Sequence, residues 1–178
     1  FIEKGIHMKT ILSDIPLTIT SQKHSLHAFD PVVLQNGKPC VGCFSCWLKT
    51  PGSCIYQDAI TDFTRIMKDS ETLYILTHNQ YGSYSPLVKC AIDRSLSYVQ
   101  PYFTIRNHEM HHVLFPNRRL QLIVIAYGPA NAQEQTDLSA LAQANGINMG
   151  CRDIQCCHCM NEQEALTLLR TMEEGIQV

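Results

Sequence analysis

The sequence predicts an α/β fold, a doubly wound parallel sheet with helices on both faces, so that three layers stack as α/β/α. Two observations carry this prediction. Residues 72–77 form a continuous apolar run of strand length, which is typical of a strand buried on both faces. Strand-like runs also alternate along the chain with segments whose apolar residues recur at helical spacing, and this alternation is the pattern of βαβ units.

Length and composition limit the classes of protein. The chain has 178 residues, of which 45% are apolar and 17% charged, and we expect one domain over residues 1–178. The net charge of -2 gives no reason to expect nucleic acid as a partner. No apolar run reaches the roughly 20 residues that span a membrane, so we expect no membrane partner. Met8 reads as a native start, and we interpret residues 1–7 as vector-derived.

The first part of the chain predicts two strands with a short connection. Residues 9–15 are an apolar run with β-branched content, and residues 26–33 alternate loosely until the turn signal at Gln35-Asn36-Gly37. Only about ten residues separate the two candidate strands, whereas a helical crossover takes about a dozen or more. We therefore expect a shortened first βα unit, with its helix lost or much reduced.

The remaining elements follow from apolar spacing and capping residues. Asp58 is a good N-cap for a helix over residues 59–67, and Pro86 suits the first turn of a second helix. Residues 101–116 predict a long, irregular connection before a strand at 120–127. The later elements that we expect are a helix at 133–144 stopped by Asn145-Gly146, a last strand at 147–154 and a terminal helix at 162–174.

Four cysteines form the most distinctive motif. Cys40, Cys43 and Cys46 recur at every third position, and Cys54 follows a Pro51-Gly52 turn. Thiolates are soft ligands that suit iron–sulfur clusters, zinc and copper(I), and the first three spacings match a bacterial four-iron ferredoxin run. The motif predicts a [4Fe–4S] cluster, with zinc or plain reduced thiols as the alternatives. Nine cysteines without a secretory signal also favour a reducing, cytoplasmic location.

Two longer motifs resemble one protein family. The cysteine segment at 39–58 and the segment at 77–94 are similar to segments of the NAD(P)H-dependent FMN reductase and iron–sulfur flavoprotein family. The resemblance extends over roughly residues 26–128. It implies a flavodoxin-like fold, FMN as cofactor, NAD(P)H as co-substrate and a small-molecule or protein electron acceptor, such as a quinone or another flavin. Because members of this fold commonly assemble around the flavin site, the resemblance also implies a homo-oligomer.

The resemblance also implies where a flavin would lie. In the family, the loop after the third strand lies against the flavin ring, and the matching residues here are Gln80, Tyr81, Gly82 and Ser83. Gly82 would let backbone approach a planar ring, and N–H groups there could bond the ring carbonyls and N5. Tyr127-Gly128, after the fourth strand, would be a further flavin-facing element. The structural alternative is an ordinary strand-to-helix turn, and no catalytic residue is assigned.

The chain departs from the family after its first strand. Family members have a Ser/Thr/Asn/Gly-rich loop there, whose N–H groups and helix dipole hold the FMN phosphate. Here the segment contains no glycine and offers only the hydroxyls of Ser13, Thr18, Thr20 and Ser21. We therefore expect the phosphate-binding loop to be missing or degenerate. This departure supports a second hypothesis, a flavin-free binding or structural module whose cysteine loop binds a metal or nothing.

Two further groups of residues carry weaker signals. The tail holds Cys151, Cys156, Cys157 and Cys159 around His158, and Cys156-x-x-Cys159 has the spacing of a redox or metal pair. Residues 109–112 read Glu-Met-His-His, which is not the His-Glu-x-x-His pattern of zinc proteases. We interpret residues 109–112 as a polar loop.

Overall fold

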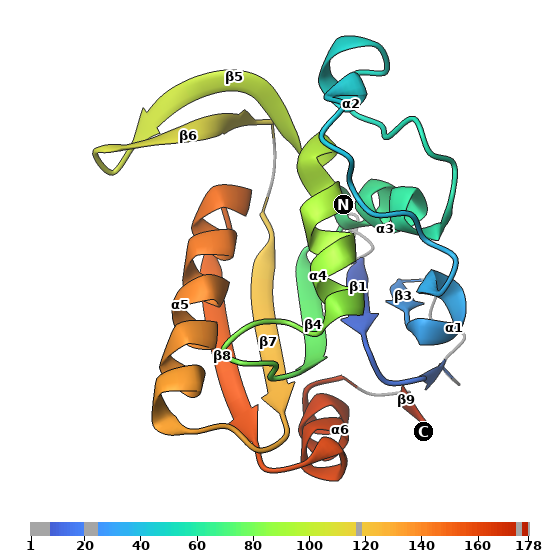
Figure 1. Cartoon of the computed structure of the whole chain (residues 1–178), viewed down its shortest axis with the longest axis vertical. Helices are drawn as coiled ribbons and strands as arrows, with labels where there is room; N and C mark the ends of the chain where they lie inside the picture. The colour runs from blue at the N-terminus through green and yellow to red at the C-terminus, as the bar shows by residue number, and fades with distance from the viewer. Residues whose placement is uncertain (1–7, 20–24, 117–118, 174–175, 178) are drawn as a thin grey trace, which may run out of the picture.

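The computed structural model describes residues 8–19, 25–116, 119–173 and 176–177. Its centre is a five-stranded parallel sheet with the strand order β3-β1-β4-β7-β8 (Figure 1). The strands are β1 (Lys9–Ser13), β3 (Leu26–Phe29), β4 (Thr72–His78), β7 (Gln121–Tyr127) and β8 (Asp153–Cys159). Numbered by chain order within this sheet, the arrangement is the 2-1-3-4-5 order of the flavodoxin-like fold, which confirms the predicted fold class.

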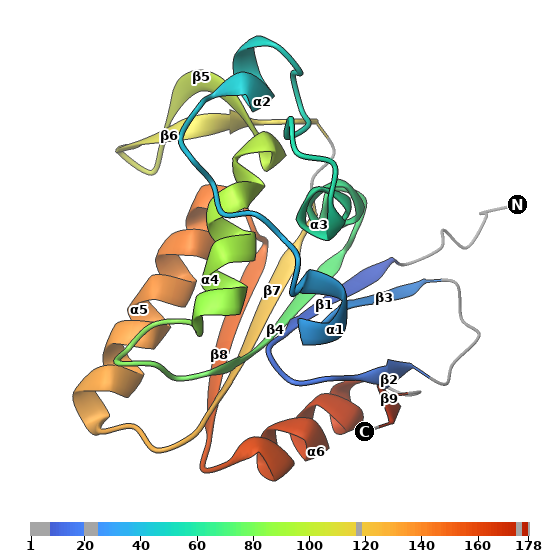
Figure 2. The ribbon, with the colours of Figure 1, turned by 45° about the vertical axis from the view of Figure 1, so that its right-hand side comes forward.

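Helices cover both faces of the sheet (Figure 2). One face carries α1 (Pro31–Leu34), α3 (Ala59–Met67), α4 (Pro86–Asp93) and α5 (Ala132–Met149), and the other carries α6 (Glu162–Met172). Strand side chains alternate between the two cores, so that Ile75 packs under α4 and α5 whereas Tyr74 packs against the core of α6. No helix in the described residues is long and apolar enough to cross a membrane.

The connection from β1 to β3 is short, as predicted. Its described residues, 14–19 and 25, form no helix and contain only the short strand β2 (Thr18–Ile19). This strand pairs antiparallel with β9 (Ile176–Gln177), close to the chain's last residues. Ile15 and Ile176 are buried beside α6, so this small ladder covers part of the sheet face that a crossover helix would otherwise cover.

The predicted second strand, at 26–33, is wrong in its second half. The strand ends at Phe29, and Asp30 caps the helix α1 because its carboxylate accepts a hydrogen bond from Val33 N (3.1 Å). The same carboxylate accepts from Leu17 N (3.0 Å), which holds the connection from β1 in place. Pro31 in the first turn fits a helix start, and this signal could have placed the boundary.

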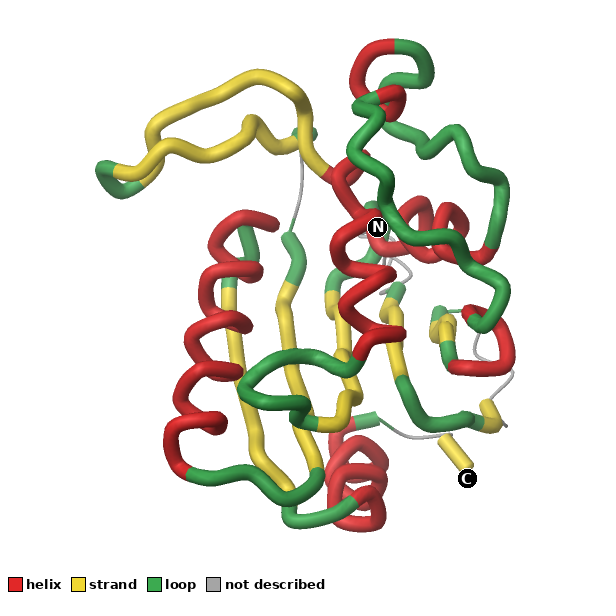
Figure 3. Tube along the Cα trace, viewed as in Figure 1, coloured by secondary structure: helices red, strands yellow, loops and turns green. Residues whose placement is uncertain are grey.

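The predicted irregular connection at 101–116 is also wrong, because most of it is a hairpin. After the short 3-10 helix η1 (Arg94–Tyr98), β5 (Val99–Arg106) and β6 (Glu109–Leu114) pair antiparallel. Asn107 and His108 make the turn with φ of 51° and 67°, a conformation that asparagine tolerates better than most residues. Figure 3 shows this hairpin reaching away from η1 and over the end of α5.

The helix predicted at 133–144 runs five residues further, to Met149. Gly146 does not stop it, because this glycine is buried where a Cβ would lie 2.5 Å from the side chain of Ile154. The stop is Gly150, whose φ of 68° is the left-handed conformation of a helix C-terminus. The last strand consequently begins at Asp153, so the prediction at 147–154 is wrong in most of its length. The helix predicted at 162–174 is α6, and residues 1–7 and 174 lie outside the described ranges.

Candidate functional site

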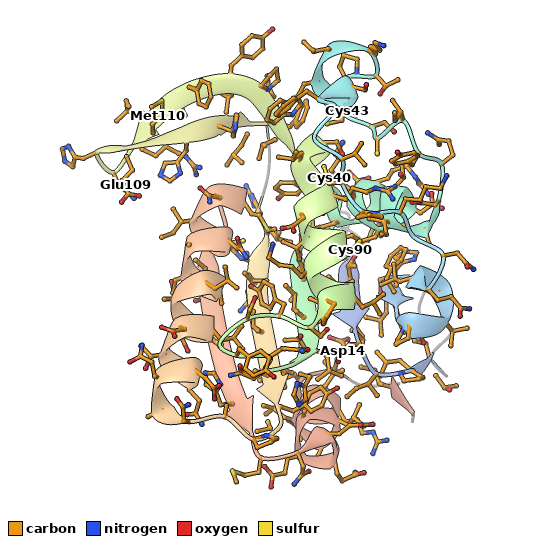
Figure 4. The ribbon with its side chains drawn as sticks, in the orientation of Figure 1. Asp14, Cys40, Cys43, Cys90, Glu109 and Met110 are labelled. Atoms are coloured by element: carbon orange, nitrogen blue, oxygen red, sulfur yellow. The ribbon has the colours of Figure 1, made fainter. Side chains whose placement is uncertain are left out.

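The two predicted sites lie at opposite ends of the sheet. The flavin loops follow β4 and β7, so they lie at the carboxyl edge. The cysteine loop lies at the amino edge, where Trp47 Nε1 donates to the carbonyls of Leu96 and Val99 (3.1 and 3.0 Å). Figure 4 shows this separation, with Asp14 near the carboxyl ends of the strands and Cys40 and Cys43 at the other end.

Two adjoining cavities occupy the carboxyl edge. The larger, of about 510 Å³, lies over the ends of β7 and β8 and the start of α5, and Tyr127 and Gly128 are among its lining residues. The smaller, of about 190 Å³, lies beside Gln80 and Tyr81. Both are lined by Asn79, Pro129 and Glu134, so they form one recessed region. Its size and its place beyond the carboxyl ends of parallel strands are those of a small-ligand site.

The Gln80–Ser83 segment is a tight turn that closes on itself. Gln80 and Ser83 exchange backbone hydrogen bonds (2.9 and 3.0 Å), and Gly82 N donates to Asn79 Oδ1 (2.9 Å). The turn has positive φ at Tyr81 and Gly82, and a Cβ on Gly82 would lie 2.8 Å from Asp137 on α5. The N–H groups of Gln80, Gly82 and Ser83 therefore already have partners in the chain, and a flavin-bound measurement would test whether this turn faces a flavin.

Tyr127 and Gly128 border the larger cavity, and both are in contact with the end of β4. The Tyr127 hydroxyl donates to Asp14 Oδ1 (3.0 Å), and its ring lies edge-on to His78, with 5.5 Å between ring centroids. Burial, reinforced by the Asp14 carboxylate, raises the pKa of Tyr127 and keeps the phenol protonated as a donor. Gly128 has φ of 98°, and a Cβ there would lie 2.6 Å from His78 Nε2.

Asp14, which we did not single out from the sequence, occupies the position directly after β1. Its Oδ2 accepts hydrogen bonds from His78 N (2.7 Å) and Thr77 Oγ1 (3.5 Å), in addition to the Tyr127 bond to Oδ1. Ser13 Oγ is bonded to Ile15 O (2.7 Å) and so is also engaged within the chain. The only sequence signal for this arrangement is an aspartate immediately after the first strand.

The environment of Asp14 does not fit an FMN phosphate. The resemblance places the phosphate loop directly after the first strand, and that position here holds a carboxylate whose charge would repel a phosphate. The loop has no helix among its described residues, so it also lacks the N-terminal dipole that binds such groups. Thr20 and Ser21, two of the predicted hydroxyls, lie outside the described residues.

The structure brings the four cysteines of the first motif together around one small cavity. Cys40, Cys43, Cys46 and Cys54 line a space of about 20 Å³, with α2 (Ser45–Leu48) beside it and apolar side chains around it. All nine cysteines are free thiols. Among the described residues, no three His, Cys, Asp or Glu side chains stand close enough to hold a single metal ion. The four thiols therefore share one space without forming a ready-made zinc site.

Arg94 fixes both ends of the cysteine loop. Its buried guanidinium donates to the carbonyl oxygen of Lys38 (2.7 Å) before the loop and forms a bidentate pair with Asp58 after it. Asp58 also caps α3, as predicted, by accepting from Ile60 N and Thr61 N. Burial alone would raise the pKa of Asp58, but the hydrogen bonds from Arg94 and the backbone outweigh it and lower that pKa.

The thiols of the loop differ in acidity. Hydrogen bonds from the Ser45 side chain and backbone lower the pKa of Cys43, which is exposed. Burial and the neighbouring thiols raise the pKa of Cys46. Outside this loop, burial raises the pKa of Cys151 to about 12. Cys43 is therefore the thiol with the clearest nucleophilic character.

Cys156 and Cys159, whose spacing would suit a redox or metal pair, do not face each other. Both residues lie in β8, where Cys156 packs with the α5 core and Cys159 with the α6 core, so their side chains are on opposite faces of the sheet. The predicted polar loop at 109–112 is wrong. These residues form strand β6, and His111 in it is buried, with Nδ1 3.0 Å from Asn148 Oδ1 on α5.

Solved structures with a similar fold include two azoreductases, one of them FMN-dependent, and a putative quinone reductase. An FMN-dependent NADH-azoreductase from Bacillus anthracis str. Ames Ancestor, in complex with FMN, covers 93% of this chain and 95% of its own, with 13% identity and a TM-score of 0.54. A putative quinone reductase from Klebsiella pneumoniae covers 88% of this chain and 77% of its own, with 16% identity and a TM-score of 0.56. An azoreductase from Bacillus anthracis str. Sterne covers 85% and 86%, with 8% identity and a TM-score of 0.51. No family model and no curated protein sequence matches the chain. At these identities the comparisons establish the fold.

Proposed function

We propose that the chain is a flavodoxin-like oxidoreductase in which a flavin carries electrons from NAD(P)H to a quinone, a flavin or a protein acceptor. The observation that carries this proposal is the cavity of about 510 Å³ at the carboxyl edge, bordered by Tyr127 and Gly128 and continuous with the smaller cavity beside Gln80 and Tyr81. The fold neighbours, described as azoreductases and a quinone reductase, support the same class. Bound there, a flavin would supply the electron transfer.

The chain's own residues shape this cavity rather than react in it. Asn79 is buried, and its side chain joins the turn after β4 to α5: its Oδ1 accepts from Gly82 N, and its Nδ2 donates to the carbonyl of Glu134 (3.3 Å). This bridge holds the turn after β4 against α5. The cavity wall on the β7 side is Ala126 and Tyr127, which offer an apolar surface and a phenol. FMN is the flavin that the resemblance implies, and its phosphate needs a place other than the β1 loop.

A cavity-filling variant tests the proposal. Ala130 lines the larger cavity, and Ala130→Trp should fill it, whereas Ala144→Trp places the same side chain on an exposed part of α5. We expect the wild type and Ala144→Trp to retain a flavin through gel filtration and to oxidise NADH in the presence of a quinone. Ala130→Trp should lose both properties. If the wild type binds neither FMN nor riboflavin, the flavin-free module becomes the better description.

We further propose that the cysteine loop holds a [4Fe–4S] cluster on Cys40, Cys43, Cys46 and Cys54. The shared cavity supports this proposal, since all four cysteines line it. A seven-residue strand spans roughly 20 Å, so a cluster at the amino edge would stand far from a flavin at the carboxyl edge of the same chain. Any exchange of electrons between them would therefore take place between chains or through the acceptor.

Anaerobic reconstitution with iron and sulfide tests the cluster. We expect a brown chromophore, bleached by dithionite, in the wild type and in Cys90→Ser, which changes a half-buried thiol on α4 outside the motif. Cys46→Ser should lose the chromophore. A colourless wild type with one bound zinc per chain would support a structural zinc site instead.

The hairpin favours a homo-oligomer, which we propose as the state of the protein in solution. Tyr102, Phe103, Ile105 and Met110 are each between 65% and 68% exposed, an unusual density of large apolar side chains for one hairpin. A paired Phe103→Ser and Ile105→Ser variant should lower the mass measured by light scattering. A monomeric wild type would exclude this proposal.

A further inference from the structure

The carboxyl edge carries negative charge where its proposed ligand would lie. Asp14 stands directly after β1 and is held by His78 N and the Tyr127 hydroxyl. Glu134 borders both cavities. Its carboxylate accepts from Asn131 N (2.8 Å) in the capping box of α5, which fixes it at this position. Glu134 therefore lines the recessed region itself, whereas Asp14 lies behind its wall, bonded to the lining residues Tyr127 and His78.

No cationic side chain of Lys or Arg offsets these charges among the described residues that line the two cavities. The basic groups there are the imidazoles of His78 and His158. Asp137 adds a further carboxylate directly beneath Gly82. A phosphate dianion placed at this edge would be repelled by nearby carboxylates without a compensating cation among the described lining residues.

The turn after β4 uses most of its own backbone N–H groups, so it offers little replacement for the missing phosphate site. The N–H groups of Gln80, Gly82 and Ser83 are engaged inside the turn. At the α5 N-terminus the capping box uses two more N–H groups, since the Asn131 side chain accepts from Glu134 N (3.0 Å) and the Glu134 carboxylate accepts from Asn131 N (2.8 Å). Several of the backbone N–H groups at this edge that could bind a phosphate are thus used by the chain itself.

We propose that the ligand of the carboxyl-edge cavity is an uncharged planar ring system without a phosphate, so that the chain binds riboflavin in preference to FMN. In this arrangement Asp14 takes the place of the phosphate and satisfies the donors that a phosphate would otherwise meet. The proposal rests on the proposed function, because it specifies which flavin that function uses.

Riboflavin and FMN share one ring system and differ by the phosphate, so a direct comparison tests the proposal. We would titrate each into the full chain and follow quenching of flavin fluorescence at low and at high salt. We expect riboflavin to bind about tenfold more tightly than FMN at low salt. The difference should shrink at high salt, because screening weakens repulsion between partly exposed charges.

Three variants test whether charge causes the preference for riboflavin over FMN. Asp14→Asn and Glu134→Gln each remove one carboxylate, and Gln at position 134 can still complete the capping box. Each should reduce the preference for riboflavin by about threefold. Asp62→Asn removes the same charge from an exposed site on α3 and should leave the ratio unchanged. Because Glu134→Gln leaves the Asp14 hydrogen bonds intact, it remains informative if Asp14→Asn fails to fold.

Each outcome separates this inference from the proposed function. FMN binding as tightly as riboflavin, or more tightly, would overturn the inference and leave the flavoenzyme in place. A preference for riboflavin that all three variants keep would also overturn it, since shape rather than charge would then exclude the phosphate. Binding of neither flavin would remove both the inference and the proposed function.

Discussion

Arg94 and Asp58 form a bidentate ion pair that joins the segment before the cysteine loop to the helix after it. The guanidinium is almost fully buried, with 2% of its side chain exposed, while 19% of the Asp58 side chain is exposed. The same Arg94 donates to the carbonyl of Lys38, so one side chain holds both ends of a twenty-residue excursion. The position of the four cysteines therefore depends on a residue outside their own segment.

Removing this arginine should destabilise the protein strongly. Arg94→Met leaves Asp58 and the Lys38 carbonyl without their charged donor, and loss of one partner of a buried pair costs about 3 kcal/mol of unfolding free energy. Urea denaturation measures this change. Arg65→Met is the matched control, because Arg65 pairs with Asp62 on the exposed side of α3 and should change stability by less than about 0.5 kcal/mol. Equal effects of the two variants would contradict the role assigned to Arg94.

The same ion pair predicts sensitivity to acid. The pKa of Asp58 is lowered in the folded state, so its contribution to stability is present above the unfolded value of about 3.9 and is lost as the pH falls through the folded value. Wild-type stability should therefore decline below about pH 4. Asp58→Asn should be less stable at neutral pH and show a weaker decline in acid. Thermal unfolding of both proteins from about pH 2.5 to about pH 7, which brackets the unfolded pKa of about 3.9, measures this difference. Stability curves of the wild type and Asp58→Asn that run parallel across this range would argue against it.

The thiols should react in a defined order. Ser45 lowers the pKa of exposed Cys43, whereas burial raises that of Cys151 to about 12. In the metal-free protein, iodoacetamide should label Cys43 first and Cys151 last, because the thiolate is the nucleophile. Peptide mass spectrometry over a time course gives the order. Ser45→Ala should slow labelling of Cys43 and leave Cys151 unchanged, and labelling of Cys151 ahead of Cys43 would refute the assignment.

Gly128 should be intolerant of any side chain. Gly128→Ala combines a positive φ with a Cβ only 2.6 Å from His78, and we expect a loss of about 3 kcal/mol of unfolding free energy. Gly42→Ala is the control, because Gly42 also has positive φ but has nothing within 4 Å of the added Cβ. It should cost about 1 kcal/mol. The difference between the two variants isolates the contact with His78, and a difference near zero would exclude it.

Local signals in the sequence were sufficient for most of the sheet and for the caps. The apolar run at 72–77 is the central strand β4, and Asp58 caps α3 as expected, because both depend on neighbouring residues alone. The prediction that Gly146 ends its helix was wrong, because this glycine instead allows a close contact with Ile154 on another element. The hairpin was missed because Asn107 and His108 form its turn without a glycine.

The site was less predictable than the fold, because it depends more on contacts between residues that are distant in the sequence. The cysteine spacing placed four thiols in one loop, and that loop does gather them. The bond from Tyr127 to Asp14, however, joins residues 113 positions apart, and no local pattern announces it. Arg94 likewise depends on partners 36 and 56 positions away. Such contacts arise only when the strand order brings these segments together.

Because the two sites lie at opposite ends of the sheet, a substitution at one site should leave the other unaffected. They share no residue, and the strands between them are packed on both faces. In a double-mutant cycle, the changes in unfolding free energy caused by substitutions at Cys46 and at Ala130 should add. The coupling energy between the two positions should lie within about 0.5 kcal/mol of zero. A lineage of such proteins could lose one site by drift and keep the other under selection, with the sheet preserved in either case.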